Sequence, residues 1–134
     1  MAKGTHEYSE DPRNAEVLVY VNGELVPRGQ ASVSVFDSGF VLGDGVWEGL
    51  RLHRGKILFL DAHLNRLFAG AQALDFDIGL DREALAAALY RTVEANNMRD
   101  HVHIRLMVTR GLKSTPYQDP RVTVGAATIV IIAV

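Results

Sequence analysis

The stretch Gly43-Asp44-Gly45-Val46-Trp47-Glu48-Gly49-Leu50-Arg51 is the centre of the predicted fold. Its three glycines permit backbone conformations that are closed to residues with a side chain. Asp44, between two of them, is expected to be a turn residue that bonds its own backbone. The alternation that follows predicts a strand with one face formed by Val46, Glu48, Leu50 and Leu52, and the opposite face formed by Trp47, Gly49, Arg51 and His53. Arg54-Gly55 then predicts a tight turn, with residues 56–60 as the returning strand.

Two amphipathic helices are predicted after this hairpin. Asp61 is expected to cap the first helix, whose apolar residues recur at helical spacing: Leu64, Leu67, Phe68, Ala71 and Leu74. Asp81 is expected to cap the second helix, which ends at Asn96-Asn97, because asparagine tolerates the left-handed conformation found at helix termini.

Several further strands are predicted from alternation and turn signals. Asn22-Gly23 joins residues 17–21 to residues 24–26, and Pro27 ends that pairing because it has no N–H donor. Residues 31–35 alternate again, and so do residues 101–110, where Val102, Ile104, Leu106 and Val108 share one face. Residues 112–120 are predicted as a loop and residues 123–134 as one strand. Together these elements predict an α+β domain with a mainly antiparallel sheet and two helices packed on it.

The composition bounds the class of protein. The 134 residues are 48% hydrophobic and 22% charged with a formal charge of -2, which is typical of a globular domain and gives no electrostatic case for nucleic acid or a membrane surface. There is no cysteine, no signal-peptide pattern and no apolar run long enough to span a bilayer, so a cytoplasmic protein is expected. Residues 1–15 are predicted to be a flexible tail and residues 16–134 one domain. The apolar end of the sequence suggests a fragment of a longer protein.

Three arginines and the tryptophan are the candidate functional residues. Arg66 lies off the apolar stripe of its predicted helix, where it is either a solvated side chain or, through its planar fork of donors, a phosphate ligand. Arg105 lies mid-strand beside His103 and Met107, where it is either an edge charge or a carboxylate anchor. Arg110 is a weaker candidate for the substrate pocket that such an anchor would serve, or else a simple turn residue. The Trp47 side chain either packs against other apolar residues or forms a wall of a pocket.

Metal and acid–base chemistry have little support in the sequence. His101 and His103 share a strand face, but no further histidine, cysteine or pair of acids accompanies them, so no metal site is predicted. His53 and His63 are assigned to packing or surface roles. The remaining carboxylates are scattered and give no acid–base pair.

Three motifs, in this order and at these intervals, resemble the N-terminal half of the fold-type IV pyridoxal-phosphate enzymes. The motifs are Gly-Asp-Gly-Val-aromatic-Glu-Gly at residues 43–49, His-Leu-x-Arg-Leu at residues 63–67, and a strand that ends in Val108-Thr109-Arg110-Gly111. That family contains branched-chain and D-amino-acid aminotransferases, (R)-amine transaminases and aminodeoxychorismate lyase. The resemblance covers residues 17–134, which is about half of a two-domain enzyme.

The resemblance implies pyridoxal phosphate as cofactor, transamination between an amino acid or amine and a 2-oxo acid, and a homodimer. Arg66 falls on the arginine that contacts the cofactor phosphate in the family. Trp47 falls on a wall of the substrate pocket that is usually Phe or Tyr, and Arg105 on a substrate-side arginine, here in Ile-Arg-Leu where the family has Ile-Arg-Pro. Arg105 favours a branched-chain-like substrate, since residues 112–120 lack the Arg-x-His of D-amino-acid aminotransferases. Trp47 leaves an unusual amine or acid open, and a lyase activity is a further alternative.

The lysine that holds the cofactor in such enzymes has no counterpart in this sequence. Lys3 lies in the predicted tail, Lys56 at a hairpin turn and Lys113 in a predicted loop, and none lies in an apolar strand. The resemblance places the lysine in a second domain, so no catalytic residue is assigned and this chain alone is expected to be inactive. A stand-alone α+β binding or assembly domain without catalysis is the alternative from another class.

Overall fold

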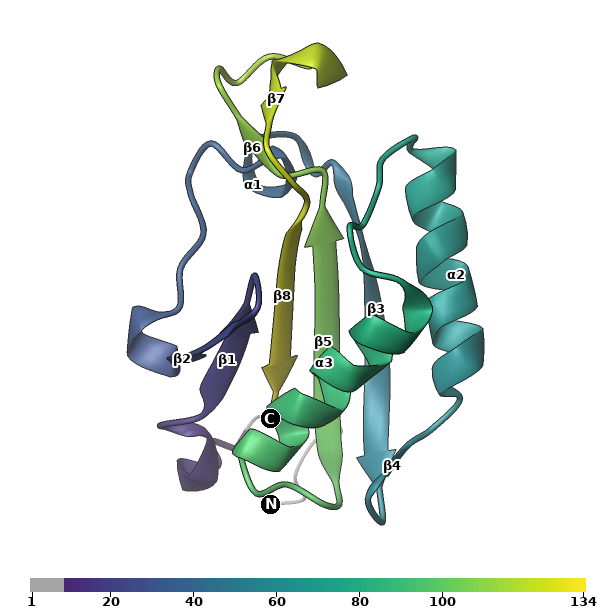
Figure 1. Cartoon of the computed structure of the whole chain (residues 1–134). Helices are drawn as coiled ribbons and strands as arrows, with labels where there is room; N and C mark the ends of the chain where they lie inside the picture. Colours follow the sequence, from purple (N-terminus) through teal and green to yellow (C-terminus); the bar gives the residue numbers. More distant parts are fainter. Residues whose placement is uncertain (1–8) are drawn as a thin grey trace, which may run out of the picture.

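The computed structural model describes residues 9–134, whose strands pair into a six-stranded sheet and a small two-stranded sheet (Figure 1). The larger sheet has the order β2-β1-β8-β5-β3-β4, and all of its neighbouring strands are antiparallel. Its strands are β1 (Leu18–Val21), β2 (Glu24–Pro27), β3 (Gly45–His53), β4 (Lys56–Ile57), β5 (Val102–Thr109) and β8 (Thr128–Ala133). The predicted α+β class with a mainly antiparallel sheet is confirmed.

The centre of the sheet follows the alternation of the sequence. Strands β3 and β5 pair along their whole length, so that Leu50 lies opposite Ile104 and Trp47 opposite Met107. On β5 the buried residues are the predicted ones, Val102, Ile104, Leu106 and Val108. Strand β8 completes the centre, with Leu106 opposite Ile131.

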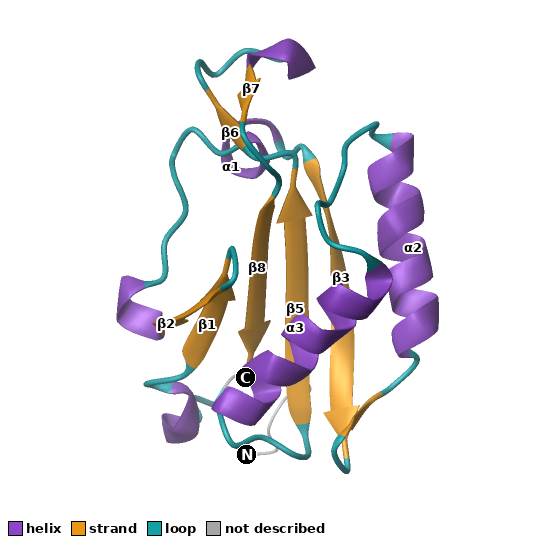
Figure 2. Cartoon of the chain, in the orientation of Figure 1, coloured by secondary structure: helices purple, strands orange, loops and turns teal. Residues whose placement is uncertain are grey.

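Helices α2 (Leu60–Ala73) and α3 (Arg82–Ala95) cover one face of the sheet, as Figure 2 shows. Helix α3 begins as predicted, because the Asp81 carboxylate accepts a hydrogen bond from the Ala84 N–H at 2.7 Å. The prediction that Asp61 caps α2 is wrong. The cap is Phe59, whose φ of 53° is left-handed, and Asp61 lies in the first turn, where its charge suits the helix dipole.

The core lies between this face and the two helices. From the sheet come Leu50, Leu52, Ile104, Leu106 and Ile131, and from the helices Leu64, Leu67, Leu85, Leu89 and Val93. All ten are at most 3% exposed, which explains why the apolar stripes of the sequence predicted the helices well. Leu74 is an exception, since it lies after α2 and is exposed.

The remaining segments depart from the prediction. Residues 31–35 form no strand, because an alternating segment becomes a strand only when it pairs with a neighbouring one. Val33 and Val35 in this segment are exposed. The predicted loop 112–120 begins with strand β6 (Leu112–Lys113), which pairs with β7 (Thr123–Val124) in the second sheet. The predicted strand 123–134 is therefore two strands, separated by a turn in which Gly125 has a φ of 79°. Strand β4 is also shorter than predicted.

Short helical turns complete the chain. Helix α1 (Ser38–Leu42) precedes the glycine stretch, and Gly43, whose φ is 67°, is its C-cap. The 3-10 turns are η1 (Pro12–Asn14), η2 (Arg28–Gln30) and η3 (Pro120–Val122). The predicted tail is therefore ordered into η1 at its end, and residues 1–8 lie outside the described part of the chain. Gly45 has a packing role, because a Cβ there would lie 2.7 Å from the Val108 carbonyl oxygen on β5.

Candidate active site

Strand β3 directs adjacent side chains to opposite faces of the sheet. Glu48 points toward α2 with only 2% of its side chain exposed, whereas Trp47 lies on the face without helices and is 59% exposed. This is the alternation that the sequence predicts. A carboxylate on the buried face of a strand requires a cationic or hydrogen-bonding partner.

Helix α2 supplies the partners of Glu48. Arg66 donates from Nε to Oε1 and from Nη2 to Oε2, both at 2.6 Å. The His63 ring nitrogen Nδ1 lies 2.8 Å from the same Oε2. Hydrogen bonds from Arg66 hold the pKa of Glu48 below its ordinary value, against burial, which would raise it, and His63 lowers that pKa further. Glu48 is therefore an ionised carboxylate at neutral pH.

The outer side of Arg66 faces solvent. Its side chain is 74% exposed although two of its N–H groups bind the buried carboxylate. Because arginine has five N–H donors, three lie outside this pair: two on Nη1 and one on Nη2. They form a second planar fork that fits phosphate oxygens. Among residues 9–134, Arg66 is thus neither simply solvated nor engaged with all of its donors.

The sequence motifs do not single out Glu48 as a functional residue, and His63 is predicted to have a packing or surface role. The alternation does indicate a partner for Glu48, because an acid on the same strand face as Leu50 and Leu52 is rarely buried without one. Spacing alone did not say which of the 14 Lys and Arg residues would provide it.

On the opposite face of β3, Arg105 stacks on Trp47. The guanidinium carbon lies 4.2 Å from the centre of the indole ring, a cation–π contact. Arg105 is paired with Gly49 in the strand register, so no side chain at Gly49 separates the two. The structure thus brings together two of the predicted substrate-side residues.

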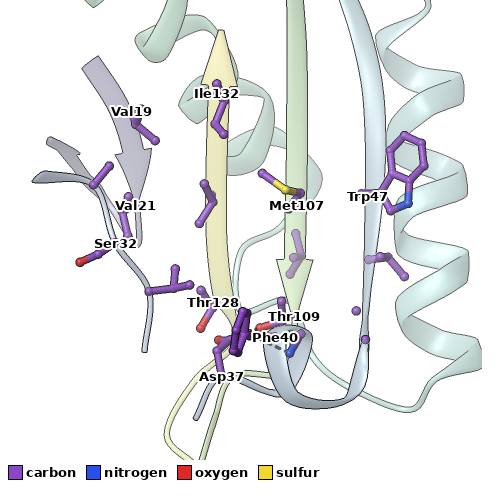
Figure 3. Close-up of a pocket in the computed structure, with 18 of the residues that line it drawn as sticks. Val19, Val21, Ser32, Asp37, Phe40, Trp47, Met107, Thr109, Thr128 and Ile132 are labelled. Carbon is purple, nitrogen blue, oxygen red and sulfur yellow. Dashed lines mark hydrogen bonds between the residues drawn. The ribbon is translucent and has the colours of Figure 1, made fainter. Parts of the chain in front are cut away.

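An apolar groove of about 670 Å³ runs across this face and includes Trp47 (Figure 3). Val19, Val21, Met107, Val130 and Ile132 form its apolar floor from strands β1, β5 and β8. Asp37, at its end, is buried, and its carboxylate accepts hydrogen bonds from the Thr109 hydroxyl at 3.0 Å and the Gly39 N–H at 2.8 Å. Such a groove suits an apolar ligand group.

Arg110 lies apart from this groove. It donates to the Asp44 carboxylate at 2.7 Å, to the Leu74 carbonyl at 2.5 Å and to the Asp75 carbonyl at 2.9 Å, with only 11% of its side chain exposed. The prediction that Asp44 bonds its own backbone is therefore wrong. The predicted contact of Arg110 with a substrate stays a prediction, but these bonds give it a structural task.

The described lysines do not lie in the groove lining. Lys113 is 2% exposed in β6, with its Nζ 3.5 Å from the Asp119 carbonyl oxygen, so its predicted place in a loop is wrong. Lys56 lies in the edge strand β4, and Lys3 precedes the described residues.

Within residues 9–134, no group of three or more histidines, cysteines or acids has the arrangement of a metal site. The pKa of His103 is lowered by burial and by the charges of Arg105 and Arg51.

No helix within residues 9–134 is long and apolar enough to cross a membrane.

A family model described as amino-transferase class IV matches residues 45–131, from the start of β3 into β8. The chain belongs to the class IV aminotransferases. The match contains Trp47, Glu48, His63, Arg66 and Arg105, so both sides of β3 lie within the family's own region.

Two relatives illustrate how this class IV aminotransferase chain compares in sequence. It is 47% identical over 122 residues to the branched-chain-amino-acid aminotransferase-like protein 1 of Arabidopsis thaliana, covering 91% of this chain and 22% of that protein. It is 41% identical over 103 residues to the D-alanine aminotransferase of Listeria innocua, covering 77% and 34%. The chain thus spans about a fifth and a third of these relatives.

Solved structures that are similar to this class IV aminotransferase chain are also matched over only part of their length. The T.th. branched-chain amino acid aminotransferase complexed with N-(5'-phosphopyridoxyl)-L-glutamate is similar with a TM-score of 0.77 and 26% identity, covering 88% of this chain and 40% of that one. A 4-amino-4-deoxychorismate lyase from Pseudomonas aeruginosa has a TM-score of 0.68 and 29% identity, covering 87% and 39%.

Proposed function

We propose that this chain is the small N-terminal domain of a pyridoxal-phosphate-dependent aminotransferase, with Arg66 as a ligand of the cofactor phosphate. The observation that carries the proposal is the outward donor fork of Arg66, held on a buried carboxylate inside the family's own region. A guanidinium fork matches phosphate oxygens in geometry and charge, so the residues present fit the group. When bound, pyridoxal phosphate supplies the electron sink needed to move an amino group to a 2-oxo acid.

We propose that Trp47 and Arg105 contact the substrate on the other side of β3. The cation of Arg105 is suited to a substrate carboxylate, and the ring of Trp47 holds its guanidinium in place. The neighbouring apolar groove is suited to an aliphatic side chain, which supports a branched-chain-like amino acid as donor.

The rest of the enzyme is proposed to lie outside these residues. The share of each relative that the chain covers supports a second domain that supplies the lysine, with residues 16–134 as the first domain. A homodimer and a cytoplasmic location, both expected from the sequence, remain proposals.

The test compares cofactor binding with and without the phosphate. In the protein at the length its gene encodes, Arg66→Gln should weaken pyridoxal phosphate by about tenfold or more, because the charge-assisted hydrogen bonds to the phosphate are lost. Binding of pyridoxal, which lacks the phosphate, should be unchanged. Absorbance titration of both compounds measures the two affinities.

Arg91→Gln is the matched control, since Arg91 is an exposed arginine on α3 that bonds the Gly23 carbonyl. It should bind both compounds as the unchanged protein does. Equal pyridoxal phosphate affinity in the Arg66 and Arg91 variants would overturn the phosphate assignment. If the natural protein bound neither compound, the non-catalytic binding domain would become the better proposal.

The similarity to the deoxychorismate lyase supports a second candidate reaction within the family. A transaminase needs a 2-oxo acid acceptor in every cycle, whereas a lyase that removes a side chain does not. Turnover of an amino donor that continues without any acceptor would therefore favour the lyase.

A further inference from the structure

Among the described residues, the buried carboxylate of Glu48 has all of its side-chain hydrogen-bond partners on one helix. Its two oxygens accept two hydrogen bonds from Arg66 and lie within hydrogen-bond distance of His63, and both partners belong to α2. Residues three apart on a helix share a face, so both reach the same point on β3. Glu48 therefore links the strand of the glycine motif to the helix of the His-Leu-x-Arg motif.

The way in which Glu48 contacts Arg66 decides which donors are left. The carboxylate accepts hydrogen bonds from Nε and Nη2, which lie next to each other along one edge of the planar guanidinium. The second fork, made by Nη1 and the remaining N–H of Nη2, points away from the carboxylate. A buried acid thus fixes the direction in which an exposed arginine presents its charge.

His63 holds the carboxylate itself. Because an ionised carboxylate can only accept hydrogen bonds, the His63 Nδ1–H donates one to Oε2, the oxygen that also accepts from Arg66 Nη2. The His63 side chain is only 22% exposed, so it has little freedom to leave this position. With both oxygens engaged, the carboxylate plane has one favoured orientation.

An exposed arginine otherwise samples many rotamers and loses that freedom when a ligand binds. We propose that Glu48, oriented by His63, is a positioning residue that holds the outward fork of Arg66 ready for the cofactor phosphate. This inference rests on the proposed function, because it takes Arg66 as the phosphate ligand. It predicts a gain in phosphate affinity from a residue that does not itself face the phosphate.

The simplest rival is an ion pair that only stabilises the packing of α2 on β3. The two roles differ in what the loss of Glu48 changes. Loss of Glu48 lowers stability in both cases, so stability does not separate them. A residue that only packs treats all ligands alike, whereas a positioning residue affects only ligands that carry a phosphate, and only while Arg66 is present.

The experiment is a double-mutant cycle on Glu48→Gln and Arg66→Gln in the protein at its natural length, with pyridoxal phosphate and pyridoxal as probes. Glutamine has the shape of glutamate but an NH2 donor in place of one acceptor oxygen, so it cannot accept the two guanidinium donors side by side, one on each oxygen. We expect Glu48→Gln to weaken pyridoxal phosphate several-fold and pyridoxal not at all. The double variant should match Arg66→Gln alone, because Glu48 acts through Arg66.

Glu94→Gln, an exposed acid on α3, is the matched control and should bind as the unchanged protein does. Glu48→Asp provides a second test if the glutamine variant does not fold. It keeps the charge but is one methylene short, so its phosphate-specific loss should be smaller than that of Arg66→Gln.

The outcomes separate this inference from the proposed function. If Arg66→Gln leaves pyridoxal phosphate binding unchanged, the phosphate assignment fails, and the inference with it. If Arg66→Gln weakens that binding but neither Glu48 variant does, the inference alone is overturned. Equal losses for pyridoxal and pyridoxal phosphate, or additive losses in the double variant, would show a packing role and overturn it as well.

Discussion

Glu48 is the residue whose chemistry depends most on its surroundings. Placed among Leu50 and Leu52 on the buried face of β3, an acid is unfavourable unless it is paired. The pair with Arg66, together with His63, converts that position into an anchor for the helix above it. On the other face, the Trp47 ring stacks against the guanidinium of Arg105 on strand β5. At both places a side chain of β3, a carboxylate or an aromatic ring, contacts an arginine.

The lowered pKa of Glu48 makes its contribution to stability depend on pH. A carboxyl whose pKa is lowered by folding stabilises the protein above its ordinary pKa of 4.5 and loses that effect as the pH falls through the lowered value. Glu48→Gln should therefore reduce the free energy of unfolding by about 1–3 kcal/mol near neutral pH. The difference from the unchanged protein should shrink as the pH falls below 4.5 and through the lowered pKa of Glu48.

Urea denaturation of both proteins at neutral and acidic pH measures this difference, and Glu94→Gln serves as the control without a buried carboxylate. A difference that stays constant or grows on acidification would contradict the role of the ionised Glu48–Arg66 pair.

Helix α2 is held near both of its ends. In its first half, His63 and Arg66 bind Glu48, and just beyond its last residue Arg110 binds the carbonyls of Leu74 and Asp75. Arg110 also binds Asp44, so it ties the end of α2 to the glycine stretch before β3. The helix that carries the proposed phosphate ligand is thereby fixed relative to the strand that carries Trp47.

Arg110→Gln should release this second attachment. Loss of a nearly buried charge that serves three acceptors should lower the free energy of unfolding by about 2–3 kcal/mol. It should also speed amide hydrogen exchange in the last turn of α2. Hydrogen-exchange mass spectrometry measures the change.

Arg121→Gln is a suitable comparison, because Arg121 forms an exposed pair with Asp119 away from α2 and should change exchange there little. An Arg110 variant with unchanged stability and exchange, but with a raised KM for the amino donor, would instead support the substrate contact expected from the sequence.

The two faces of the whole sheet are unequal. Helices α2 and α3 cover one face, and the other carries the apolar groove lined by Met107, Val130 and Ile132 (Figures 1 and 3). Apolar grooves of this size on a protein surface usually mark a place where a ligand or another chain binds. The exposed side chains of Val33 and Phe40 also line this groove and add apolar surface to it.

The chain covers only 40% of a similar solved structure, so we expect the protein at its natural length to be larger than 14.7 kDa. The apolar groove is suited to contact with another chain, so we also expect a dimer. Intact mass spectrometry gives the chain mass, and sedimentation equilibrium gives the mass of the assembly. An assembly mass equal to the chain mass at micromolar concentration would contradict the dimer. A chain mass of 14.7 kDa would contradict the second domain.

Local patterns in the sequence were enough to predict the faces of β3 and β5, the hairpin at Asn22-Gly23 and the helix that starts after Asp81. Strand alternation, turn conformation and helix capping involve residues close in the chain, so each can be recognised without the rest of the fold. The family motifs also singled out Arg66, Trp47 and Arg105 as candidate site residues, whose roles stay predictions.

The partners that these residues meet could be found only in the folded chain. Residues 31–35 have the alternation of a strand but no neighbour to pair with, whereas Leu112–Lys113, predicted as a loop, finds β7. The Glu48–Arg66 and Asp44–Arg110 pairs join residues 18 and 66 positions apart. Local patterns report burial and backbone conformation, but hydrogen bonds and ion pairs need atoms that folding brings within about 3 Å of each other.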